Sequence, residues 1–209
     1  MSFLTKFKDL TVEALKDNKK LIIGLYILFM VCAAATWILS AARVESVVGS
    51  MPSVNTTAAT GIQLVGATEL FINNEWGGIE TYIFSVFFAI PAFVMLIYNA
   101  FNLGALGQLF SQIIPNGGLK YIVYIIPHGI FEITATVIQS AAGVVLFLFI
   151  WRFIKAWRSS KKASDAFEQT KKILIQSIML MIFATILLII AAPIEAYVSV
   201  PLSNLIVGP

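Results

Sequence analysis

Long uncharged, apolar segments are the feature that most limits what this chain can fold into. Residues 21–42 contain no charged side chain, and a helix of about 20 such residues spans the hydrocarbon core of a bilayer. Charged residues make up 12% of the 209 residues, about half of the ~25% that a soluble domain carries. Because lipid offers no hydrogen bonds to an open backbone, we predict an all-α, polytopic transmembrane helix bundle.

The hydropathy pattern predicts about five crossings within a single integral membrane domain, residues 1–209. These crossings are residues 21–42, 79–98, 103–127, 129–151 and 173–197. The third is predicted to be a discontinuous helix, because its two apolar halves are each too short to span a bilayer. The residues expected to break the helix there, and again before the fourth crossing, are Pro115, Gly117, Gly118, Pro127 and Gly129.

Three polar segments complete the predicted architecture. Residues 2–18 place apolar side chains at helical spacing with charges on the other faces, which predicts an N-terminal interfacial helix in the headgroup plane. Residues 43–78 are rich in Thr, Asn, Ser and Gly and are predicted to form an external loop. Residues 152–172 are strongly basic and are predicted to be a cytoplasmic segment.

The distribution of basic residues predicts the orientation of the chain. Twelve of the 14 Lys and Arg residues fall in residues 1–20 and 152–172. Cytoplasmic loops are the ones enriched in Lys and Arg, so we expect both segments in the cytoplasm and an odd number of crossings between them. We therefore expect a multi-pass cell-membrane protein with its N-terminus cytoplasmic and its C-terminus external. The same clustering accounts for the basic composition, so no nucleic-acid partner is expected.

Ionisable residues inside the apolar segments predict a polar cluster. His128, the only histidine, and Glu132 lie four residues apart and share one helix face. In the predicted topology Glu195 lies at a similar depth on the fifth crossing. Such groups cost at least about 2.5 kcal/mol each on insertion scales and persist where they face protein or a water-filled path. We therefore predict a buried cluster of His128, Glu132 and Glu195, with further polar packing by Asn74, Asn99, Asn102 and Gln139.

Three interpretations of this cluster remain open. It can be a structural clasp between helices, a proton- or ion-handling site, or a metal site. One imidazole and two carboxylates can hold a divalent cation, but zinc sites generally offer more nitrogen or sulfur ligands. The chain has no Gly-x-Ser-x-Gly elbow, and its single histidine cannot complete a His-Glu-x-x-His motif. We therefore assign no catalytic residue, metal or cofactor and expect no enzymatic activity.

Four sequence motifs resemble the stage II sporulation protein M family of integral membrane proteins. They are residues 126–132 (Ile-Pro-His-Gly-Ile-Phe-Glu), 192–198 (Ala-Pro-Ile-Glu-Ala-Tyr-Val), 71–74 (Phe-Ile-Asn-Asn) and 99–104 (Asn-Ala-Phe-Asn-Leu-Gly). The most specific part is Pro-His-Gly-x-x-Glu, whereas Ala100 departs from the family's usual Asn-Gly. For spore formers the resemblance implies a membrane partner of cell-wall hydrolases during engulfment. Because relatives also occur in archaea and non-sporulating bacteria, it implies an architecture and a scaffold role more than sporulation itself.

The leading functional hypothesis is a multi-pass scaffold that sits in the lipid bilayer and recruits protein partners in or outside the membrane. One alternative is a transporter or channel for a small solute or ion that uses Glu132, Glu195 and His128. A second alternative is an intramembrane metal-dependent hydrolase built on the same residues. Small residues at positions 33–35 and 140–143 also offer faces for a homo-oligomer.

Overall fold

The computed structural model describes residues 2–43, 45 and 66–208, and every regular element within them is helical. In chain order the elements are α1 (Phe3–Asp17), α2 (Lys19–Leu39), α5 (Ala67–Phe84), α6 (Ile90–Ile113), α7 (Gly117–Ser160), α8 (Ala163–Ile194), η1 (Glu195–Ser199) and α9 (Val200–Val207). The predicted all-α membrane bundle is confirmed. Most of the predicted external loop, residues 44 and 46–65, lies outside the described residues.

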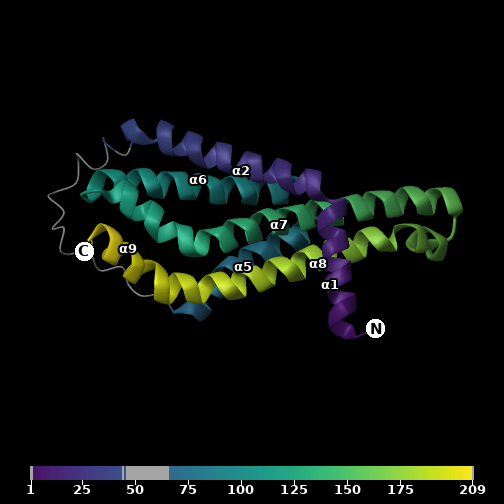
Figure 1. Ribbon diagram of the computed structural model, residues 1–209. Coiled ribbons are helices and arrows are strands. Elements are labelled where there is room, and N and C mark those ends of the chain that lie inside the picture. The colour runs from purple at the N-terminus through teal and green to yellow at the C-terminus, as the bar shows by residue number, and fades with distance from the viewer. Residues whose placement is uncertain (1, 44, 46–65, 209) are drawn as a thin grey trace.

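Four helices in the described part of the chain are long and apolar enough to cross a membrane: α2, α6, α7 and the continuous rod of residues 163–207. The sequence predicts five crossings, and the difference lies in α5. This helix has 18 residues, three of them glutamates, and it runs in the opposite direction to α6 (Figure 1). The passes α2, α5, α6, α7 and α8 therefore alternate in direction, and α9 lies at the opposite end of the bundle from α1 (Figure 1).

The predicted bounds of the second and third crossings are wrong. Residues 79–98 are divided by a turn at residues 85–89, where α5 ends and α6 begins. Pro91 lies in the first turn of α6, where its missing N–H leaves no helix hydrogen bond unmade, so it starts a helix instead of kinking one. Residues 103–113 continue α6 and residues 117–127 begin α7. The predicted discontinuous crossing is therefore the end of α6 and the start of α7, which run antiparallel to each other. The predicted loop of residues 43–78 is helical from Ala67 onward.

A tight turn between α6 and α7 is the physical reason for this error. Asn116 adopts the left-handed conformation with a φ of 55°. A Cβ atom on the following Gly117 would lie 1.8 Å from the carbonyl oxygen of Phe110, so only glycine allows this close approach. Pro115, Gly117 and Gly118 thus reverse the chain between two helices and do not interrupt one.

Prolines lie inside the two longest helical segments, and the helical path of the chain continues past each of them. Pro127 lies inside α7, which continues for 44 residues to Ser160, so the helix break predicted at Pro127 and Gly129 is wrong. The N-terminal third of α7, which contains Pro127, runs at an angle to the rest (Figure 1). In membranes the backbone groups that a proline frees are satisfied by neighbouring helices, side chains or local adjustments. The fifth predicted crossing, residues 173–197, is likewise only part of a rod that begins at Ala163 and passes Pro193.

The helices α7 and α8 form a hairpin, and the basic segment of residues 152–172 is its far end. We call residues 152–172 the basic hairpin. Its turn contains Lys161 in the left-handed conformation, with a φ of 58°. The hairpin extends beyond α1, which lies across the bundle (Figure 1). The helix predicted at residues 2–18 is therefore present as α1, at the same end of the molecule as the basic hairpin.

Polar bonds fix α1 against α8. Lys172 Nζ lies 3.0 Å from Asp17 Oδ2 and 2.7 Å from Glu13 Oε1, and Gln176 Nε2 donates to Asp17 Oδ2 at 2.7 Å. The hydrogen bond from Lys172, followed by the one from Gln176, holds the pKa of Asp17 below its usual range. Thr11 and Ala14 are buried under this contact.

Small residues let α7 occupy the centre of the bundle. It contacts α2, α5, α6, α8, η1 and α9, and Ala135, Ala141 and Ala142 are fully buried. A Cβ atom on Gly143 would lie 2.7 Å from Ser85 Oγ, so the helices approach closely, as is common in membranes. The prediction that residues 140–143 form a face for a homo-oligomer is wrong, because this segment packs inside the protomer.

The α2–α6 contact yields a test of this packing. A Cβ atom on Gly104 would lie 2.2 Å from the carbonyl oxygen of Ala33, whereas nothing lies within 4 Å of a Cβ atom on Gly24. We expect Gly104→Ala to force α2 and α6 apart and to lower the free energy of unfolding by about 1–3 kcal/mol. Gly24→Ala, the matched control in α2, should leave stability unchanged or raise it by up to about 1 kcal/mol through helix propensity. Thermal unfolding in detergent measures both, and equal stability of the two variants would contradict the contact.

Candidate functional site

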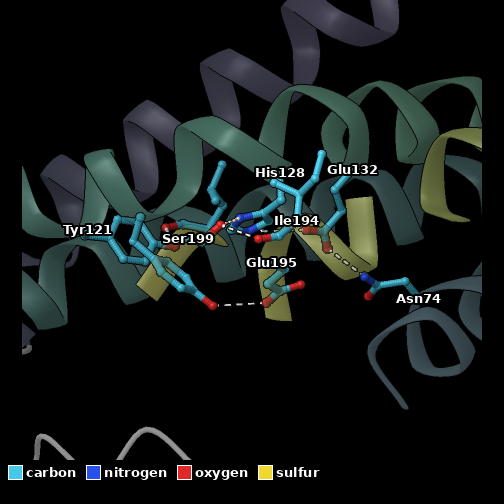
Figure 2. A network of polar contacts seen from close by, with 9 residues as sticks. Asn74, Tyr121, His128, Glu132, Ile194, Glu195 and Ser199 are labelled. Carbon is cyan, nitrogen blue, oxygen red and sulfur yellow. Dashed lines mark hydrogen bonds and ion pairs between the residues drawn. The ribbon is translucent and has the colours of Figure 1, made fainter. Parts of the chain in front are cut away.

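Three ionisable side chains from two helical segments meet inside the bundle. His128 and Glu132 lie one turn apart on α7, and Glu195 is the first residue of η1 (Figure 2). One potential ligand atom from each residue lies within 4.8 Å of the other two, and His128 Nε2 is 3.8 Å from Glu132 Oε2. The structure thus brings together all three residues that the sequence predicts as a cluster.

Each member of this cluster is also held by a residue outside it. Asn74 Nδ2 on α5 donates to Glu132 Oε1 at 3.0 Å, and the Tyr124 hydroxyl donates to Glu195 Oε1 at 3.1 Å. His128 Nδ1 is hydrogen-bonded to Ser199 Oγ at 2.8 Å. Figure 2 shows these bonds on opposite sides of the cluster. Hydrogen bonds to residues outside the cluster therefore fix the orientation of all three side chains.

A π-helical segment supplies two of these groups from one short stretch of chain. After Pro193 the rod widens from an α-helix into η1, whose first and last residues are Glu195 and Ser199. Proline removes a helix hydrogen bond, and single-turn π segments inside α-helices are frequent at functional sites. Widening the turn brings both Glu195 and Ser199 into contact with residues of α7.

The cluster lines a cavity of about 340 Å³. Asn99, Asn102, Tyr121 and Gly129 line the same cavity. A second cavity of about 210 Å³ is lined by Asn74, Gln139 and several hydroxyl side chains. Both cavities are lined by Asn99 and Thr136, so polar side chains continue from the cluster along α7 into the bundle.

The other sequence-predicted polar residues have different places. Asn74 binds the cluster directly, whereas Asn99 and Asn102 line its cavity. Gln139 belongs to a neighbouring group, since its Nε2 donates to Glu75 Oε2 at 3.3 Å. Of the predicted helix breakers, Pro127 and Gly129 flank His128 in α7, and Pro115, Gly117 and Gly118 belong to the α6–α7 turn.

Sequence reasoning missed four polar residues of this region. Glu75 accepts a hydrogen bond from the Thr185 hydroxyl at 2.7 Å, but the sequence assigns it to an external loop. Tyr124 precedes His128 by four residues, so the helical spacing Tyr124–His128–Glu132 was the signal that could have found it. Tyr121 and Ser199 carry no comparable signal, because tyrosines and serines are common in membrane helices.

The arrangement can hold a positive charge. In the described residues no Lys or Arg forms an ion pair with Glu132 or Glu195. Two neighbouring carboxylates away from water repel each other unless a proton or a cation lies between them. The geometry therefore suits proton sharing or cation binding, as well as a simple interhelical clasp.

Comparison with known proteins gives a family match over most of the chain. The sequence profile of a family described as Stage II sporulation protein M matches residues 24–200, which contain the whole cluster. The chain is also 34% identical over 116 residues to an uncharacterized protein of Methanocaldococcus jannaschii. That match covers 55% of this chain and 60% of the relative, so the chain spans less than two thirds of the length of this curated relative. No solved structure matches the chain.

The hydrogen bond between Tyr124 and Glu195 yields a test of the site. Tyr124→Phe removes the only hydroxyl that donates to Glu195 within the described residues. We expect the free energy of unfolding to fall by about 0.5–1.5 kcal/mol, the net contribution of one hydrogen bond, because Glu195 is only partly buried. Tyr197→Phe, at an exposed position two residues after Glu195, is the control and should change stability by less than about 0.5 kcal/mol. Indistinguishable melting temperatures for the two variants would show that this bond does not hold the site together.

Proposed function

Because the chain belongs to the stage II sporulation protein M family, we propose that it is a multi-pass membrane scaffold that recruits partner proteins and catalyses no reaction itself. In this proposal the N-terminus and the basic hairpin are cytoplasmic and the C-terminus is external. The distribution of Lys and Arg supports that orientation. In spore-forming bacteria the partners that the family resemblance implies are cell-wall hydrolases, and in this orientation they would meet the external side of the protein.

The observation that carries the proposal is the length of the α7–α8 hairpin. At about 1.5 Å per residue, the 44 residues of α7 extend roughly 66 Å, about twice the ~30 Å of the bilayer core. We infer that the part of both helices that extends beyond α1 (Figure 1) lies outside the hydrocarbon. This projecting part exceeds what anchoring requires and suits a docking surface for a partner on the cytoplasmic side.

The charge of this projecting part supports the same conclusion. Residues 152–172 contain seven Lys or Arg residues and two acidic residues, and Trp151, Trp157 and Phe167 are exposed on it. Basic side chains combined with exposed aromatic rings suit either anionic headgroups or an acidic partner surface. The basic hairpin can therefore attach to the membrane surface and also recruit a partner.

Partner recruitment is tested by affinity purification from native membranes in mild detergent, followed by mass spectrometry. We expect a near-stoichiometric partner with the wild type and at least a tenfold loss in the triple variant Arg152→Gln, Lys155→Gln, Arg158→Gln. The control Lys6→Gln, Lys8→Gln, Lys16→Gln removes the same charge from exposed positions of α1 and should retain the partner. No stoichiometric partner in the wild type, or equal loss in both variants, would contradict a scaffold that uses the hairpin.

A transporter or channel for a small solute or ion is the second candidate, and two cavities that share Asn99 and Thr136 in their lining favour it. Transporters commonly place ion sites between helices at membrane depth. In proteoliposomes this candidate predicts pH- or cation-dependent flux that Glu132→Gln abolishes. Glu80→Gln, which changes an exposed glutamate on α5, should leave the flux unchanged. Absence of flux across a broad panel of ions would remove this candidate.

A further inference from the structure

We propose that His128, Glu132 and Glu195 bind one divalent transition-metal cation that joins α7 to η1. The inference is independent of the scaffold role, because a metal clasp can hold the bundle of a scaffold or of a transporter. The three side chains carry six polar atoms, of which three bind residues outside the cluster and three face one another.

Each of the three side chains has one atom held from outside and one turned inward. Glu132 Oε1 accepts from Asn74, Glu195 Oε1 accepts from Tyr124, and His128 Nδ1 bonds to Ser199. Within the described residues, the hydrogen bonds of these three side chains use only the outer atoms, and His128 Nε2 and the second carboxylate oxygen of each glutamate line the shared cavity. Metal-binding histidines and carboxylates are typically oriented in this way by partners on their outer atoms.

The hydrogen bonds of Ser199 determine which nitrogen of His128 can bind a cation. The Ser199 hydroxyl has a single hydrogen, and when it donates this hydrogen to the carbonyl oxygen of Ile194 at 3.3 Å it accepts from His128 Nδ1–H. The neutral imidazole then carries its lone pair on Nε2. His128 is 1% exposed and lines one cavity together with both glutamates, so this lone pair faces the cluster.

Two acceptors therefore face each other without a donor between them. His128 Nε2 lies 3.8 Å from Glu132 Oε2, too far for a direct hydrogen bond, and Glu195 adds a second carboxylate within 4.8 Å. Two neighbouring carboxylates repel each other where water is scarce. A cation placed between the three inner atoms removes this repulsion and gives each of these atoms a partner.

The donor set indicates the kind of cation. One imidazole and two carboxylates combine the ligand that suits Zn²⁺, Fe²⁺ or Ni²⁺ with the ligand that suits Mn²⁺ and harder ions. Three protein ligands leave at least one position for water, and the cavity of about 340 Å³ provides the space. The inner atoms are up to 4.8 Å apart, so binding draws the carboxylates inward by rotation of the flexible glutamate side chains.

Metal content of the purified protein is the first test. The protein in detergent is equilibrated with ZnCl₂ or MnCl₂ at pH 7.5, desalted and analysed by inductively coupled plasma mass spectrometry. We expect about one equivalent of one of these metals per chain, and a raised melting temperature when it is bound. Less than about 0.1 equivalent of either metal in the wild type would overturn the proposal and leave a clasp or a shared proton as the role of the cluster.

Matched variants localise the metal. Glu195→Gln and His128→Ala should each weaken binding at least tenfold, the size of effect seen even for changes around metal ligands. Glu75→Gln alters the neighbouring carboxylate that binds Thr185 and Gln139 and should retain about one equivalent. Equal retention by all three variants would overturn the site.

A measurement on the wild type guards against variants that fail to fold. Co²⁺ added to metal-free wild-type protein should produce visible ligand-field absorption that saturates at one equivalent and disappears when Zn²⁺ is added. Absence of this absorption, together with no metal uptake, would overturn the site whatever the variants do. Partner recruitment by the basic hairpin is read out separately, so failure of one proposal is distinguishable from failure of the other.

Discussion

The absence of water in the hydrocarbon core is the constraint on which this structure depends. A polar group that cannot reach water must find its partner inside the bundle, and in the described residues no fully buried side-chain nitrogen or oxygen lacks a hydrogen-bond partner. The outer surface shows the complementary pattern, because Phe87, Phe88 and Ile90 are all more than half exposed. The interior consequently holds hydrogen-bonded polar side chains beside an apolar core. This explains why residues as far apart in sequence as Asn74 and Glu195 converge on the cluster around Glu132.

Helix type and approximate position were predictable because a bilayer permits few alternatives. An uncharged segment of suitable length must be helical, and residues 21–42 correspond closely to α2. The predicted helix boundaries were wrong at prolines and glycines, because either residue can begin, bend or end a helix. Pro91 begins a helix, Pro127 bends one, and Gly117 follows a reversal of the chain. Only the packing around each residue separates these outcomes, and a single sequence does not contain that packing.

The candidate site was predictable to the extent that it depends on helical spacing and on rare residues. The sequence identified His128, Glu132 and Glu195 from the free-energy cost of placing an ionisable group in a membrane. Such groups persist in apolar segments mainly where they face protein or a water-filled path. Glu75 was missed for the opposite reason. It lies in α5, whose three glutamates make the helix resemble a polar loop, although its hydrogen bonds to Gln139 and Thr185 place it in the bundle.

The proposed sides of the membrane for the two termini do not depend on how deeply the α5–α6 pair enters the bilayer. The reason lies in the turn at residues 85–89, which joins α5 to α6. It carries no charged residue, and the aromatic rings of Phe84, Phe87 and Phe88 are exposed around it. Such a tip is as compatible with lipid as with water, so the pair can be a full transmembrane hairpin or a re-entrant one. A hairpin adds two crossings or none, and either number leaves the parity of the chain unchanged. The proposed placement of the two ends on opposite sides of the membrane is therefore compatible with either depth of this hairpin.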